Sequence, residues 1–216
     1  MYRAPLTPWR RLRARSLFVA ILVLAGGPAG VEGAGGGAAT IAYDRTPGAV
    51  VVRFTEVPGE LAEADGGPVL TVYGDGRATV RYPPYMRRAG TYTVRLARPE
   101  VDALVASLAD KGLVELDAAR EQQSLRAAEA SRAAAAGAGD AALVAVTDEA
   151  TTIVDLTLER YDPADGPPLT DVRQRIVWHG LREDAARHGR LGAVGGLDGA
   201  RRELLDLMER VHDGAR

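Results

Sequence analysis

The sequence has no cysteine, few aromatic residues and a single lysine, and each shortage excludes a class of protein or site. The absence of cysteine excludes a disulfide scaffold, a thiolate metal site and a lipid-anchored lipobox. Aromatic residues make up 5% of the 216 positions, and Lys111 is the one lysine among 27 basic residues. With 46% hydrophobic and 26% charged residues, the composition also excludes a disordered polyelectrolyte and a polytopic membrane protein. One domain of ordinary size remains, and packing alone has to stabilise it.

The first 33 residues are typical of a secretory signal peptide. Five arginines and no acid precede the apolar run 16–25, and Gly26-Gly27-Pro28 then interrupts the helical pattern. A membrane span needs about 20 apolar residues, so this run favours a cleaved signal over the alternative of a retained anchor helix. Sites with small residues place the cut between residues 33 and 39. Sec export fits better than twin-arginine export, because the residues around Arg10-Arg11 match the latter poorly.

Cleavage changes the charge of the protein. Residues 1–33 hold five arginines and one acid, so the chain after cleavage keeps 22 basic and 28 acidic groups, a net charge of −6. This charge argues against nucleic acid as a partner, since phosphate binding needs a positive surface. Abundant arginine, alanine and glycine indicate a GC-rich bacterial genome. We therefore expect a periplasmic or secreted bacterial protein without stable membrane insertion after cleavage.

A Gly/Ala-rich tether is expected over residues 34–48, followed by a single domain over 49–216. The β-branched run 49–55 predicts a strand. The clearest local signal follows, because the runs 69–73 and 78–82 are joined by Gly74-Asp75-Gly76-Arg77 and predict a tight hairpin. A further strand is expected over 91–96.

Helices are expected on one face of this sheet. Pro99 predicts a helix start, Gly112 its end, and apolar residues recur between them with helical spacing. The Ala-rich stretch 118–139 predicts a solvated, loosely docked helical insertion, because its one large apolar residue is Leu125. The second half repeats the first, with strands expected over 142–146, 151–161 and 171–179 and helices over 182–187 and 198–211, the last capped by Asp198. The pattern predicts an α+β fold, an antiparallel sheet with helices packed on one face and two strands-then-helix halves.

The residues 69–116 resemble a group of exported bacterial proteins of unknown function. The resemblance is carried by the hairpin Tyr73-Gly74-Asp75-Gly76, the strand 92–96 and the docking helix 101–108. Some proteins of that group have a Cys-Pro near the hairpin, which this chain lacks. The resemblance implies a fold and an exported location, and it implies no activity.

Catalytic motifs are missing from the sequence. None of the four serines lies in Gly-x-Ser-x-Gly, and the three histidines form no metal-binding pair, with His212 expected at a frayed terminus. No cofactor motif is present and none is expected. The leading interpretation is a non-catalytic module that binds an unknown protein or envelope component. The alternative is a metal-independent hydrolase using His179 with Asp155 or Glu183.

The loop that follows the hairpin is the candidate for partner binding. Tyr85, Met86, Arg87 and Arg88 are side chains favoured at recognition surfaces, and Pro83-Pro84 stiffens the loop. A second interpretation is that Tyr85 and Met86 tuck under the edge of the sheet as a plug. Both interpretations stay open on the sequence alone.

Export predicts a defined change in mass. Protein recovered from the periplasm or the medium should lack about 33–39 N-terminal residues in an intact-mass measurement, because signal peptidase removes the signal. A full-length species found only in the cytoplasm would contradict this expectation.

Overall fold

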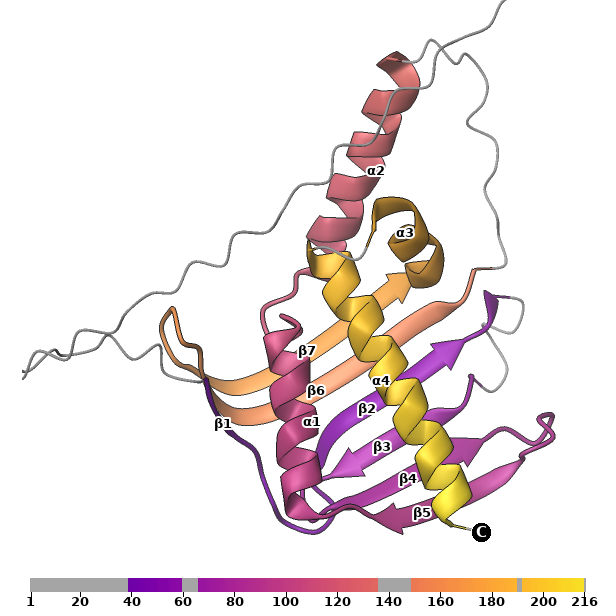
Figure 1. The fold of residues 1–216 in the computed structure, drawn as a ribbon, viewed down its shortest axis with the longest axis vertical. Coiled ribbons are helices and arrows are strands. Elements are labelled where there is room, and N and C mark those ends of the chain that lie inside the picture. Colours follow the sequence, from indigo (N-terminus) through magenta and orange to yellow (C-terminus); the bar gives the residue numbers. More distant parts are fainter. Residues whose placement is uncertain (1–38, 60–65, 136–148, 190–191, 216) are drawn as a thin grey trace, which may run out of the picture. The chain divides into compact units, whose positions relative to one another are not determined.

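Alternating apolar residues place seven strands in one antiparallel sheet within residues 39–59, 66–135, 149–189 and 192–215, which are the ranges this computed structural model describes. Figure 1 shows the strands crossed on one face by helices. The strands are β1 (Thr40–Ala42), β2 (Val50–Val57), β3 (Val69–Tyr73), β4 (Arg77–Tyr82), β5 (Gly90–Arg95), β6 (Thr151–Asp162) and β7 (Leu169–His179). The helices are α1 (Arg98–Asp110), α2 (Ala118–Ala135), α3 (Leu181–His188) and α4 (Gly192–Gly214).

Strand β6 connects the two halves of the sheet. One edge of β6 pairs with β7 along nearly its whole length. The other edge pairs with β2 and then, near the end of β6, with β1. From β2 the sheet continues through β3 and β4 to β5. The strands of the second half, β6 and β7, therefore continue the sheet beyond β2, and β5 and β7 form its two ends.

The hairpin β3–β4 is confirmed, with a loop of three residues. Gly76 has φ +87°, and its N–H donates to the Tyr73 carbonyl at 3.0 Å. The Asp75 carboxylate accepts from the Arg77 N–H at 3.0 Å. A side chain at residue 76 would place its Cβ 2.6 Å from the Leu96 carbonyl oxygen, so both the positive φ and the close approach require glycine.

Helix α1 covers the sheet as its apolar spacing predicts. Its buried residues are Val101, Leu104, Val105, Leu108 and Ala109. At its start the Glu100 carboxylate accepts from the Ala97 N–H at 2.7 Å, and at its end Gly112 has φ +80° while the Leu113 N–H donates to the Leu108 carbonyl. These contacts satisfy backbone groups that a helix end leaves without partners.

Helix α4 begins earlier than predicted, at Gly192 instead of Asp198. The pair Gly195-Gly196 lies inside the helix, and a Cβ at residue 196 would lie 2.4 Å from the Lys111 carbonyl oxygen. Glycine thus allows α4 to approach the end of α1. Asp198 is not the cap; it lies within ion-pair distance of Arg201 (3.8 Å) and Arg202 (3.2 Å).

Part of the expected tether belongs to the folded domain. Thr40–Ala42 form β1 against β6, and Tyr43 is 5% exposed. Its hydroxyl donates to Asp102 Oδ1 at 2.6 Å, which joins the N-terminal strand to α1. The pKa of Tyr43 is raised to about 12, mainly by burial of the side chain and to a smaller extent by this hydrogen bond.

Helix α2 is present where the Ala-rich composition predicts a helix, and Ala118 is its one buried residue. Leu125 packs against the core only in part, and Gln122 Nε2 donates to the Val177 carbonyl at 3.1 Å. The helix therefore lies beside β7 without adding much to the core.

The α+β fold with helices on one face of an antiparallel sheet is confirmed. The predicted strand 142–146 and the signal with its cleavage range lie outside the described residues, apart from residue 39 at the end of that range. None of the described helices is long and apolar enough to cross a membrane.

Two substitutions at Tyr43 separate burial from hydrogen bonding. We expect Tyr43→Ala to lower the free energy of unfolding by about 3 kcal/mol, as for other buried aromatic residues, and Tyr43→Phe by about 1 kcal/mol. Denaturant titration measures both. A negligible effect of Tyr43→Ala would show that residues 34–48 are a tether throughout.

The same tyrosine predicts a pH dependence. Its pKa in the folded protein lies above the ordinary value of 10.0, so the stabilisation is complete below pH 10 and is lost as the pH rises through about 12. The difference between the ultraviolet titration curves of the wild type and Tyr43→Phe should show this late ionisation.

Helix α2 allows a test of the opposite kind, because we expect it to contribute little to the stability of the fold. Replacing residues 119–135 by a Gly/Ser linker should change the melting temperature by only a few degrees, because little apolar surface is lost. The matched control is Leu104→Ala in α1, expected to lower the free energy of unfolding by about 2–5 kcal/mol. A linker variant as destabilised as this control would show that α2 is part of the core.

Candidate functional site

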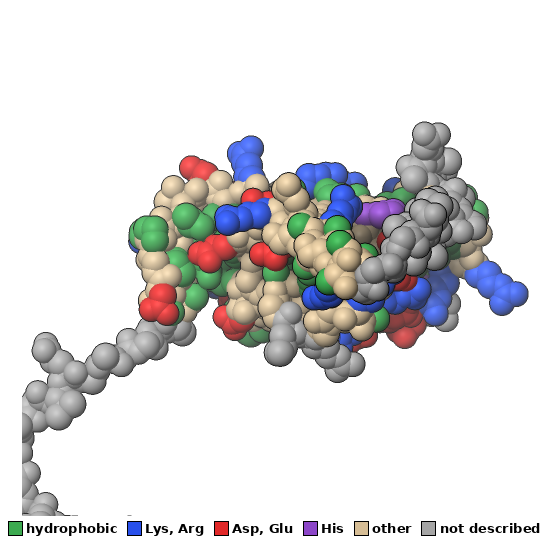
Figure 2. All heavy atoms as spheres, turned by 90° about the horizontal axis from the view of Figure 1, so that it is seen from above, with side chains coloured by type: hydrophobic (Ala, Val, Ile, Leu, Met, Phe, Trp, Pro, Cys, Tyr) green, Lys and Arg blue, Asp and Glu red, His purple; other side chains and the backbone are tan. Residues whose placement is uncertain are grey.

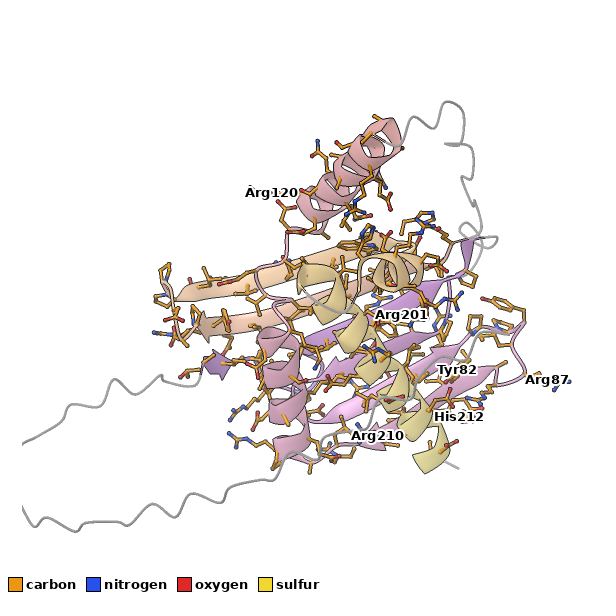
Figure 3. The ribbon with its side chains drawn as sticks, turned by 45° about the horizontal axis from the view of Figure 1, so that its top comes forward. Tyr82, Arg87, Arg120, Arg201, Arg210 and His212 are labelled. Carbon is orange, nitrogen blue, oxygen red and sulfur yellow. The ribbon has the colours of Figure 1, made fainter. Side chains whose placement is uncertain are left out.

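The loop 83–89 consists of two successive turns beside the C-terminal half of α4. The Met86 N–H donates to the Pro83 carbonyl at 3.1 Å, and the Ala89 N–H donates to the Met86 carbonyl at 2.9 Å. These turns fix the direction of the four predicted binding residues. Figure 3 shows Arg87 projecting away from the sheet into solvent.

The four predicted residues have different environments. Tyr85 is 53% exposed, and its hydroxyl lies 3.5 Å from the Gly66 carbonyl. Met86 is half-buried and packs against the core, so the tucked residue of the loop is Met86 and not Tyr85. Arg88 pairs with Glu209 of α4, and both side chains are about half exposed, so the pair contributes little to stability.

Behind this loop lies a hollow of about 400 Å³, here called the Met86 hollow. Its apolar lining includes Met86, Leu181, Pro58 and Pro68. Its polar lining includes Glu56, Thr152, Arg182, Glu183 and Arg201. Apolar walls with a few convergent polar groups are the usual character of a ligand site.

A charged pair forms one wall of the Met86 hollow. Arg201 Nε and Nη2 both donate to Glu56 Oε1, at 2.9 and 2.7 Å. The side chains are only 13% and 21% exposed, so each charge needs the other. Since both bonds use Oε1, Glu56 Oε2 remains as an acceptor. Figure 3 shows Arg201 on the side of α4 that faces the sheet.

Thr152 contributes a hydroxyl to the wall of the Met86 hollow. The residue is 1% exposed, lines the Met86 hollow and is the direct cross-strand neighbour of Glu56. Within the described ranges its side chain forms no hydrogen bond. A hydroxyl in this position can donate to or accept from a polar group that enters the hollow.

His179 pairs with neither Asp155 nor Glu183, the two carboxylates expected near it. The side chain is exposed at the end of β7, and its Nδ1 lies 3.1 Å from the Thr151 hydroxyl. Asp155 pairs with Arg175 at 3.0 Å, and Glu183 lies 3.3 Å from Arg182. The geometry therefore does not assemble the histidine–carboxylate pair on which the hydrolase alternative depends.

The expectation that His212 lies at a frayed terminus is wrong. Its ring is 1% exposed and lies edge-on to Tyr82 and Tyr92, with centroid distances of 5.7 and 4.5 Å (Figure 3). Burial raises the pKa of Tyr82, an effect that the nearby Arg88 guanidinium opposes. This cluster fixes the end of α4 beside the loop 83–89.

The single lysine has a structural position that the sequence did not indicate. Lys111 Nζ donates to Glu203 Oε2 at 2.8 Å, and the Ser107 hydroxyl donates to the same oxygen at 2.8 Å. Lys111 Nζ also bonds to the Ser107 hydroxyl. A serine beside a lysine is a nucleophile–base arrangement in some enzymes. Here the Glu203 carboxylate binds both groups, so the trio joins α1 to α4.

Sequence reasoning identified Met86 but not the other walls of the hollow. Glu56 and Arg201 are separated by 145 positions, and neither belongs to a motif. Among the described residues, no group of three or more His, Asp or Glu side chains is placed to hold a metal ion. No family model, curated protein or solved structure matches this chain.

Proposed function

We propose that this is an exported, non-catalytic module that binds a protein of the bacterial envelope through Tyr85 and the Met86 hollow. The observation that carries the proposal is the exposed Tyr85 next to Met86, whose hollow combines apolar walls with the Thr152 hydroxyl and the Glu56 carboxylate. The exported location rests on the N-terminal sequence.

The hollow favours a partner side chain with an apolar stem and a hydrogen-bonding end. The stem would contact Met86 and Leu181, and the end would bond to the Thr152 hydroxyl and Glu56 Oε2. Tyr85, which precedes Met86 in the loop and is 53% exposed, would add a large, rigid contact area of the kind found at interface anchors. On the face seen in Figure 2, hydrophobic side chains are interspersed with charged ones, which favours one localised anchor over a broad apolar interface.

Tyr85→Ala and Thr152→Val test this proposal with small structural cost. Tyr85 is more than half exposed, and the Thr152 side chain makes no hydrogen bond that valine would lose. Each substitution should weaken binding to the envelope partner by on the order of 1–2 kcal/mol while the melting temperature stays nearly unchanged. Affinity is measured by surface plasmon resonance on the partner recovered with the wild-type chain from native envelopes.

The matched control is Val177→Ala, which shortens another exposed apolar side chain, in β7 and on the face of the sheet opposite the hollow. It should leave both binding and melting unchanged. Equal binding by Tyr85→Ala, Thr152→Val and Val177→Ala would remove the proposed site. A drop of several kcal/mol in the stability of Tyr85→Ala would instead restore the interpretation of Tyr85 as an edge plug.

A further inference from the structure

The face of the sheet opposite the helices is polar over β2–β5. Because directly opposed residues of antiparallel strands share a face, the pairing Arg53–Thr71–Thr79–Thr93 places one arginine and three threonines in a row across four strands. The buried residues Leu70, Val72, Ala78 and Val80 alternate with this row and face the helices. Figure 1 shows α1 and α4 together on one face.

This open face is positive although the expected mature chain is negative. Over β2–β5 it carries Arg53, Arg77, Arg81 and Arg95, and its one carboxylate is Asp75 in the turn, 3.6 Å from Arg95. Arg53 and Arg81 are exposed and have no ion-pair or hydrogen-bond partner among the described side chains. The neighbouring Asp155 pairs with Arg175 of β7. Arg53 therefore lies at one end of the threonine row, and Arg81 lies beside the row on β4.

We propose that this face, defined by Arg53, Arg81 and the row Thr71–Thr79–Thr93, is a docking surface for a polysaccharide that carries carboxylates. Arginine binds carboxylates through a planar fork of donors, and the threonine hydroxyls can both donate to and accept from sugar hydroxyls. The three threonine side chains make no hydrogen bonds within the described residues. Neighbouring strands lie about 4.8 Å apart, so the row offers a flat line of hydroxyls about 10 Å long to an extended chain.

The same face fits other polyanions less well. Single-stranded nucleic acid needs exposed aromatic rings for stacking, and the ring of Tyr73 lies under the Arg77 guanidinium, 3.7 Å from its centroid. A protein partner needs a buried apolar anchor. The large hydrophobic residues exposed in the described ranges are Val50, Tyr85 and Val177. Of these only Val50, the first residue of β2, lies on β2–β5. The surface is also distinct from the Met86 hollow, which lies on the helix side.

Isothermal titration of the full chain with alginate, a polyuronate, tests the proposal, with neutral dextran as the uncharged control. The double variant Arg53→Ser/Arg81→Ser should raise the dissociation constant about tenfold, the sum of two exposed ion pairs of roughly 0.7 kcal/mol each. The matched control is Arg126→Ser/Arg132→Ser on α2, which removes the same charge from two exposed arginines without partners. It should leave the dissociation constant unchanged.

Three results would overturn the inference. They are no binding of alginate at low salt, equal weakening by the two double variants, and equally tight binding of polyglutamate or single-stranded DNA. The last would show that charge alone is recognised. The Tyr85→Ala variant should bind alginate as the wild type does, so failure of this surface and failure of the Met86 hollow can be told apart.

Discussion

The close approach of α4 to the end of α1 decides which surfaces the protein exposes. Gly196 lies against the Lys111 carbonyl, where any side chain would collide with the backbone, and the Lys111–Glu203 pair joins the same two helices. The two helices can therefore lie side by side on one face of the sheet. They bury Phe54, Leu70 and the other inward residues of the strands. The opposite face is left without a helix, and threonine and arginine fill it.

Local signals in the sequence predict most of the fold. The Asp75-Gly76 turn and the period-two alternation of β3 and β4 predict the hairpin, because the turn and the pleat are properties of neighbouring residues. The apolar spacing of α1 predicts a helix with one buried face for the same reason. The predictions are wrong where a contact between residues far apart in the sequence determines the local structure. Gly195-Gly196 has the local appearance of a break, and only the Lys111 carbonyl explains why glycine is needed inside a helix. Tyr43 follows a strand of only three residues, which is too short to give a clear pattern, and its hydroxyl bonds to Asp102 of α1, 59 positions away.

The sequence likewise predicts one part of the candidate site and not the rest. The composition of the loop 83–88 points to Met86, but Glu56, Thr152 and Arg201 come from β2, β6 and α4. No spacing in the sequence connects three such elements. The roles of the loop residues also depend on the tertiary structure, since Met86 is half-buried while the adjacent Tyr85 is exposed. The residue types therefore indicate recognition, while the fold determines which of them contacts the core.

The distribution of charge partners supports the proposal of a recognition module. Catalytic acids and bases need polar groups that a buried environment holds ready to gain or lose a proton. In the described part of the chain, the charges of the helix side that are well shielded from solvent have partners, as in the Arg201–Glu56 and Lys111–Glu203 pairs. Groups left with hydrogen-bonding capacity include the Thr152 hydroxyl on the helix side and Arg53 and Arg81 on the open face. A hydroxyl and a guanidinium of this kind can bind other molecules through hydrogen bonds. The two proposed surfaces therefore differ in their ligands: we propose a single inserted side chain for the Met86 hollow and an extended anionic chain for the open face.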